Sequence, residues 1–219
     1  MMVWEVWNVR NWLVHGPSQE LSGLELASIP GFLEDLQRYR MTPICQVFDC
    51  SCASLHWSLP EHDYFRLDTD TSWSEQHGLY GVGAVLRDSH GKLIGAGSWP
   101  RLYASSVGQA ELISISKGLQ YAREFQVTHL CVFNDAMGAI SLLGSSLLPC
   151  NEDRFLVDEV KNLGVSLDVI SFKYTSHECN GVAYSLARFA LSIDVPMFWS
   201  EIDSLQWLCE CIQVDLSAL

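Results

Sequence analysis

Apolar and polar residues alternate with a period of two in several stretches of the chain, a pattern typical of β-strands. The alternation predicts one strand over 64–73 and two more within 80–99, with the turn residues of "DSHGK" between these two. Short turns between consecutive strands indicate an antiparallel meander. Two later stretches bounded by turn residues are also predicted to be strands, 128–135 and 168–176.

Apolar residues that recur every three or four positions predict the helices. The long segment 106–125 carries such a stripe, formed by Leu112, Ile115, Leu119 and Ala122. The same period marks three more stretches, 136–146, 151–164 and 180–193. The resulting order, β-β-β-α-β-α-α-β-α, returns the later strands parallel to the first through helical crossovers. We therefore expect an α/β fold with a mixed five-stranded sheet, three antiparallel strands then two parallel additions, and helices on both faces.

The two ends of the chain differ in pattern from its centre. Residues 1–62 are interpreted as an N-terminal segment of short helices and a linker, in which Trp57 is expected to dock on the domain that follows. Residues 63–195 contain the predicted sheet and its helices. Residues 196–219 are interpreted as a helical C-terminal tail.

Composition limits the functions that the chain can have. Its 219 residues are 48% hydrophobic and 18% charged, which is typical of a packed globular protein. The net charge of −13 opposes binding to phosphate backbones, so a nucleic-acid role would need cations or a local basic patch. The eight cysteines lack zinc-site spacing. Because no secretory signal and no membrane-spanning apolar run are visible, we expect an intracellular protein of the nucleus or cytoplasm, with reduced thiols.

Several carboxylates stand where strands and a helix would bring them together. Asp68 and Asp70 share one face of the first predicted strand, although strands are poor in Asp. Asp135 ends the fourth strand, and Glu111 lies in the first turns of the long helix. Each acid alone is more typical of a turn, a cap or a partner of the helix dipole. Together, Asp70, Glu111 and Asp135 predict a cation site, and oxygen ligands of this kind suit Mg²⁺ or Mn²⁺.

A set of motifs follows the order found in one known family. The segments are "RLDTDTSW", "GVGAVLRDSHGKLIGAGS", "QAELISISKGLQYA", "VFNDA" and "HECNGVAYSLARFA". They resemble the ribonuclease H-like domains common in plant non-LTR retroelements and their stand-alone relatives, which belong to the type 1-like ribonuclease H superfamily. The flanking segments "VWEVWNVRNWLVHG" and "VPMFWSEIDSLQWLCECIQVDL" are similar to that family's flanks, so the resemblance covers most of the chain.

That resemblance implies a Mg²⁺-dependent endoribonuclease, with Mn²⁺ as the other candidate ion. It would hydrolyse the RNA strand of an RNA–DNA hybrid by a two-metal mechanism. Asp70, Glu111 and Asp135 match three of the family's four acidic positions and are the expected metal ligands. Tyr184 stands at the degenerate fourth position, and a neutral phenol binds Mg²⁺ poorly, so weakened activity is expected. His177 could take part in proton transfer, or it could be a solvated loop residue.

The residues leave more than one function open. The alternative to a ribonuclease is a catalytically reduced ribonuclease H-like module from a domesticated retroelement, which binds nucleic acid or a protein; a third is a structural relic. The retained acids favour the enzyme. Tyr184 and the absence of Lys and Arg in 74–83, the loop expected over the hybrid, favour reduced activity and weak, salt-sensitive binding. Asp68 is interpreted as structural, and Glu178 is the only other acid near the fourth position.

Overall fold

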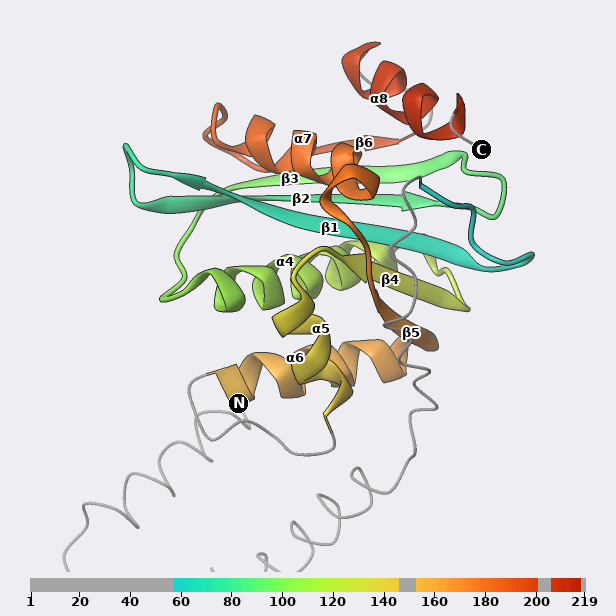
Figure 1. The fold of residues 1–219 in the computed structure, drawn as a ribbon, viewed down its shortest axis with the longest axis horizontal. Coiled ribbons are helices and arrows are strands. Elements are labelled where there is room, and N and C mark those ends of the chain that lie inside the picture. Colours follow the sequence, from blue (N-terminus) through green and yellow to red (C-terminus); the bar gives the residue numbers. More distant parts are fainter. Residues whose placement is uncertain (1–56, 146–152, 201–205, 218–219) are drawn as a thin grey trace, which may run out of the picture. The chain divides into compact units, whose positions relative to one another are not determined.

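The computed structural model describes residues 57–145, 153–200 and 206–217 (Figure 1). All of these belong to one compact unit, Ile44–Leu219. The helices predicted before residue 57 lie outside the described residues.

Six strands form a single sheet in the described part of the chain (Figure 1). They are β1 (Phe65–Ser74), β2 (Leu79–Arg87), β3 (Leu93–Leu102), β4 (Leu130–Asn134), β5 (Val169–Tyr174) and β6 (Met197–Ser200). Their order across the sheet is β5-β4-β1-β2-β3-β6. β1, β2 and β3 form the expected antiparallel meander, and β4 and β5 are added in parallel beside β1. The predicted mixed α/β sheet is confirmed.

The sheet has one strand more than the five that the sequence predicts. The additional strand, β6, comes from the segment after residue 195 and pairs antiparallel with β3. Only four residues form it, and Met197 and Phe198 are exposed whereas Trp199 is buried. Four residues are too few for alternation to distinguish a strand, and pairing with β3, about a hundred positions earlier, decides its structure.

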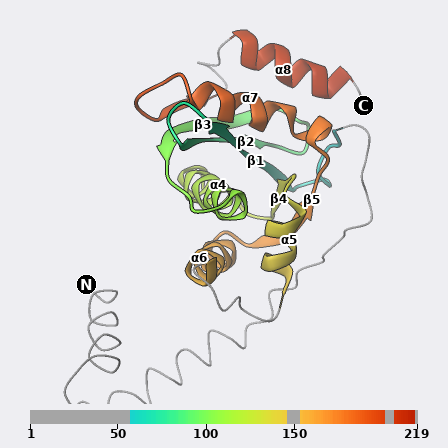
Figure 2. The same cartoon turned by 60° about the vertical axis from the view of Figure 1, so that its left-hand side comes forward.

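Helices cover both faces of the sheet (Figures 1 and 2). The helices are α4 (Val107–Ala122), α5 (Met137–Gly144), α6 (Asp153–Ser166), α7 (Gly181–Ala190) and α8 (Gln206–Ser217), with two short 3₁₀ turns, η1 (Arg123–Phe125) and η2 (His177–Asn180). α4, α5 and α6 lie on one side, and α7 and α8 lie on the other. None of the helices described is long and apolar enough to cross a membrane.

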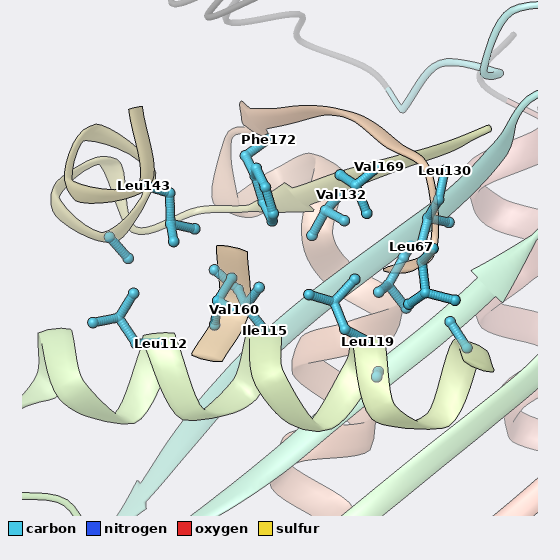
Figure 3. Close-up of a cluster of buried hydrophobic side chains, with 14 of the residues drawn as sticks. Leu67, Leu112, Ile115, Leu119, Leu130, Val132, Leu143, Val160, Val169 and Phe172 are labelled. Carbon is cyan, nitrogen blue, oxygen red and sulfur yellow. The ribbon is translucent and has the colours of Figure 1, made fainter. Parts of the chain in front are cut away.

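The stripe predicted on the long helix forms one hydrophobic core. Leu112, Ile115 and Leu119 of α4 are fully buried in a cluster with Leu67 of β1 and Phe172 of β5 (Figure 3). The helix begins at Ser106, whose hydroxyl accepts a hydrogen bond from the Gln109 amide at 3.1 Å. The predicted amphipathic helix is therefore confirmed.

A second core lies on the other face of the sheet. Val182 and Leu186 of α7 are buried there with Trp199 of β6 and with Leu208 and Ile212 of α8. The C-terminal segment thus covers α7 and extends the sheet.

Asp68 lies in a buried network of charges on this second face. The Arg66 guanidinium donates to Asp68 Oδ1 from Nε at 2.8 Å, and Arg87 Nη2 lies 3.1 Å from Oδ2. Arg87 Nη1 continues the network to Asp215 of α8 at 2.7 Å. Trp57 is buried, as expected, with its ring 4.0 Å from the Arg87 guanidinium carbon and its Nε1 donating to Asp68 at 3.3 Å. Asp68 is therefore a structural residue.

Gly83 of β2 lets α7 lie directly against the sheet. A Cβ atom at this position would stand 2.2 Å from the Ala183 carbonyl oxygen and 2.4 Å from the Ala187 amide nitrogen. Both obstacles are backbone atoms, so α7 itself would have to move. We expect Gly83→Ala to lower the free energy of unfolding by about 3 kcal/mol, as overpacked cores do, measured by urea denaturation.

Gly138 of α5 provides the matched control for this substitution. A Cβ atom there would meet nothing within 4 Å. Because alanine is the better helix former, Gly138→Ala should leave stability unchanged or raise it by up to ~1 kcal/mol. Equal losses in the two variants would contradict the close packing of α7.

Candidate functional site

Residues from β1, β4 and η2 come together beside the C-terminal end of β4. β1 and β4 are parallel neighbours, and their last pair joins Asp68 to Phe133. Asp70 and Asp135 each follow two residues later, at the same end of the two strands. β1 itself continues to Ser74, so Asp70 lies beyond its pairing with β4 and not at the end of the strand. His177 arrives on η2, just after β5.

Asp70, Asp135 and His177 form a cluster of potential metal ligands. One ligand atom from each side chain lies within 4.8 Å of the other two, and no other group of three such His, Cys, Asp or Glu side chains occurs in the described residues. His177 Nδ1 is 2.9 Å from Asp135 Oδ2. Asp70 is buried, Asp135 is partly buried and His177 is exposed. The cluster therefore opens to solvent on the His177 side.

Glu111 approaches the same edge from α4, but protein donors hold its carboxylate. Oε1 accepts a hydrogen bond from the Thr71 hydroxyl at 2.5 Å, and Oε2 accepts one from Asn134 Nδ2 at 2.9 Å. Glu111 is outside the three-residue cluster, although its charge acts on Asp70. The structure thus joins Asp70 and Asp135 and places Glu111 beside them.

Burial and charge make Asp70 an unusual carboxyl group. Burial, followed by the charges of Asp135 and Glu111, raises its pKa to about 9, against the opposing hydrogen bond from the Thr71 amide. Burial also raises the pKa of Glu111, which its hydrogen bonds from Thr71 and Asn134 oppose. Asp70 Oδ2 is buried and has no hydrogen-bond partner among the described residues. A buried orphan oxygen beside two further ligand groups fits a divalent cation.

The raised pKa of Asp70 predicts how the metal-free protein responds to pH. In the folded state its pKa is about 9, above the ordinary 3.8 of an unfolded chain. The stability that the protonated group contributes is full below 3.8 and is lost as the pH rises through 9. We expect Asp70→Asn to be more stable than the parent at pH 8–9 in the presence of a chelator. Its stability should also change less with pH between the two pKa values, 3.8 and about 9, as measured by chemical denaturation.

Asp63 provides the control for this pH profile. Its side chain is 85% exposed. Asp63→Asn should therefore leave the pH dependence of stability as it is in the parent. A profile for Asp70→Asn that is parallel to the parent profile would show that Asp70 is not protonated in the metal-free fold.

Two asparagines that the sequence analysis did not assign to the site brace it. Asn134 donates from Nδ2 to Glu111 and to the Thr69 carbonyl oxygen at 3.1 Å, and its Oδ1 accepts from the Ala136 amide at 2.8 Å. Asn180 donates from Nδ2 to the same Thr69 oxygen at 3.0 Å. Asn134 directly precedes Asp135, and Asn180 stands one helical turn before Tyr184; these positions are the signal that could have found them.

An aromatic ring occupies the position that the motif resemblance assigns to the fourth acidic residue. Tyr184 of α7 meets the His177 ring edge to face, with centroids 4.7 Å apart and planes at 70°. The Arg188 guanidinium carbon lies 5.8 Å from the centre of the Tyr184 ring. Glu178 is exposed and outside the ligand cluster. The structure thus brings Tyr184 and His177 to the site and keeps Glu178 apart from it.

The loop over the site is shorter than the predicted range 74–83. β1 ends at Ser74 and β2 begins at Leu79, so most of 74–83 belongs to strands. Cross-strand pairs run without interruption up to Ser74 and Leu79, which extends the hairpin. Only 75–78 remain as the turn.

Comparison with known proteins places the fold. Residues 68–190 match the sequence profile of the family described as reverse transcriptase-like. Ribonuclease H1 from the halophilic archaeon Halobacterium salinarum NRC-1 is 21% identical over 59% of this chain and 98% of its own, with a TM-score of 0.54. LC11-ribonuclease H1, isolated from compost by a metagenomic approach, is 15% identical over 59% and 96%, with a TM-score of 0.52.

A second structure of LC11-ribonuclease H1, in complex with an RNA/DNA hybrid, gives nearly the same comparison. It is 15% identical over 58% of this chain and 96% of its own, with a TM-score of 0.52. At these identities the likeness is one of fold. No curated protein matches the chain significantly.

Proposed function

The chain belongs to the reverse transcriptase-like family and has a ribonuclease H-like fold, and from this premise we propose that it is a divalent-metal-dependent endoribonuclease acting on RNA–DNA hybrids. The observation that carries the proposal is the meeting of Asp70 and Asp135 at one edge of the sheet, where a buried Asp70 oxygen has no partner among the described residues. The proposed catalytic domain is 63–195.

Asp70 and Asp135 are the side chains that would hold Mg²⁺ or Mn²⁺, with Glu111 completing the acidic set. When bound, such ions activate a water and stabilise the charge that develops on the phosphate and the leaving 3′ oxygen, in the two-metal arrangement. Asp70 must lose its proton to act as a ligand, because its pKa is about 9 in the metal-free fold. Thr71 and Asn134 hold the Glu111 carboxylate in a fixed orientation.

Proton transfer is one role that the sequence leaves open for His177, and it requires an imidazole that is not bound to an ion. His177 is exposed, and its Nδ1 is paired with Asp135, which leaves Nε2 on the other side of the ring. An imidazole in this position can give a proton to a leaving oxygen. The Tyr184 ring packs against it and restricts its orientation.

The proposed substrate follows from the family and the neighbours. LC11-ribonuclease H1 has been solved with an RNA/DNA hybrid, which supports the same substrate class for this chain. RNA would be recognised by its 2′-hydroxyl groups. The net charge of −13 makes binding weak and salt-sensitive. A hybrid substrate would place the protein in the nucleus or cytoplasm, and the motif resemblance supports descent from a plant retroelement.

A cleavage assay tests the proposal directly. The RNA strand of a hybrid carries a 5′ label, and matched RNA–RNA and DNA–DNA duplexes serve as controls, in low salt with Mg²⁺ or Mn²⁺. We expect internal cuts in the hybrid RNA alone, which a chelator abolishes. Hybrid that stays intact in both metals would exclude the enzyme.

Tyr184 favours a second candidate function, a binding module with little catalysis. The fourth acidic position holds a phenol ring packed on His177 in place of a carboxylate. Such a module, from a domesticated retroelement, would bind nucleic acid or a protein without cleaving. Fluorescence anisotropy of labelled hybrid distinguishes the binding module from the enzyme. A module that binds the hybrid raises the anisotropy and releases no product, and a module that binds a protein partner does neither.

A further inference from the structure

The ligand cluster of this chain contains a nitrogen donor. His177 Nδ1 lies 2.9 Å from Asp135 Oδ2, within the cluster that Asp70 completes. Two ligands bound side by side to one ion, each at about 2.0–2.2 Å, stand roughly 3 Å apart. The separation of His177 and Asp135 therefore fits two neighbouring ligands of a single ion.

A simple ion pair between His177 and Asp135 explains less of the structure. It would account for the 2.9 Å contact, but it leaves a second observation without a cause. Asp70 Oδ2 is buried and unpartnered, and Asp70 belongs to the same cluster. A buried polar atom of this kind normally has a partner. A cation bound by all three side chains accounts for both observations.

The surroundings of His177 hold the imidazole in place for this role. Tyr184, at the position where the resembled family has its fourth carboxylate, lies edge to face with the imidazole, with the ring centroids 4.7 Å apart. Both oxygens of Glu111 already accept hydrogen bonds, from Thr71 and Asn134. Among the described residues, the ligand cluster contains two aspartates and a nitrogen donor, and the fourth position holds a phenol in place of a carboxylate.

We propose that His177 is a metal ligand that takes over from the missing fourth carboxylate, and that the site consequently selects Mn²⁺ over Mg²⁺. Mg²⁺ requires a regular shell of oxygen ligands and retains its waters, whereas imidazole suits transition ions. Mn²⁺ shares with Mg²⁺ the preference for carboxylate oxygens, and as a first-row transition ion it also takes an imidazole nitrogen. This inference assumes the metal site of the proposed function, and it adds which ion that site prefers.

The test measures metal binding in the full chain, without substrate. Mn²⁺ is titrated and the free ion is followed by its electron paramagnetic resonance signal, with Mg²⁺ as competitor. Pulsed measurements on the loaded protein detect coupling to a ligand nitrogen. We expect nitrogen coupling in the parent and a preference for Mn²⁺ over Mg²⁺ of about tenfold or more. Groups that only hydrogen-bond to metal ligands change metal affinity about 10–100-fold, so a direct ligand should have at least the smaller of these effects.

Four variants separate the ligand from its surroundings. His177→Ala should lose the coupling and at least about tenfold in Mn²⁺ affinity. His177→Asp should also lose the coupling, but should bind Mg²⁺ more tightly than the parent. Tyr184→Phe keeps the ring and should retain the coupling. His129→Ala, an exposed histidine beside the opposite end of β4, should behave like the parent.

The outcomes that overturn this inference differ from those that overturn the proposed function. Absence of nitrogen coupling, or coupling that persists in His177→Ala, would exclude His177 as a ligand, even if the chain cleaves hybrid. Equal affinity for the two ions would overturn the selection of Mn²⁺. Nitrogen coupling that depends on His177, together with a preference for Mn²⁺, would support the ligand even in a chain that cleaves nothing.

Discussion

Asp70→Asn is expected to lower hybrid cleavage by about 10³-fold or more while the chain stays folded. Asp70 is the buried member of the ligand cluster, and asparagine offers no negative charge to a cation. Charge stabilisation by a bound ion is worth several kcal/mol of the barrier, and every 1.36 kcal/mol is a factor of ten in rate. Single-turnover cleavage of labelled hybrid in Mn²⁺, compared with the parent, measures the loss.

The neighbouring aspartate gives the contrast that makes this result specific. Asp68→Asn removes a charge from a buried network with Arg66 and Arg87, so it should destabilise the fold and leave the cleavage rate of the folded fraction close to the parent. Asp70→Asn should do the opposite, losing activity and gaining stability at high pH. Activity in Asp70→Asn above a tenth of the parent's would remove Asp70 from the proposed catalytic set.

The local pattern of the sequence was enough to predict the elements that build the main core. Leu112, Ile115 and Leu119 recur at helical spacing, and they are the residues that α4 buries against the sheet. The strand β6 was missed because four residues with one buried Trp199 carry little periodic signal. The predicted length of the loop over the site was too great because the polar residues of "SEQHG" hide the continuation of both strands in the sequence pattern.

The site was predictable to the extent that it depends on strand direction. Parallel neighbours must bring Asp70 and Asp135 to one edge, and the structure does so. The hydrogen bonds of Glu111 depend instead on the distance between α4 and the end of β4, which the packing of the two layers sets. The pairing of His177 with Asp135 joins residues 42 positions apart, and no local pattern encodes it.

The charged network around Asp68 was the least predictable feature. Arg66 and Arg87 are each only 1% exposed, although alternation in a strand allowed a solvated outer face. Their burial depends on Asp215, which is 128 residues from Arg87 and arrives on α8. A buried guanidinium is tolerated only where paired carboxylates surround it, so the C-terminal helix and the sheet depend on each other.

Arg87→Met is accordingly expected to cause a large loss of stability. Methionine fills much of the same volume, but the carboxylates of Asp68 and Asp215 would remain buried. Asp215 would then have lost the arginine with which it forms its ion pair. Removal of one partner from a buried ion pair costs about 3–5 kcal/mol. For a chain of this size, that corresponds to a decrease in Tm on the order of 10 °C, measurable by calorimetry.

Arg101→Met is the matched control for Arg87→Met, because it removes an arginine from an ion pair at the surface. Arg101 pairs with Asp194, and their side chains are 65% and 77% exposed. Water already stabilises both charges, so this substitution should cost less than ~1 kcal/mol. If the two variants lost the same stability, burial would not be what makes the Arg87 network strong, and α8 would have to be held by its apolar contacts, Leu208 and Ile212, alone.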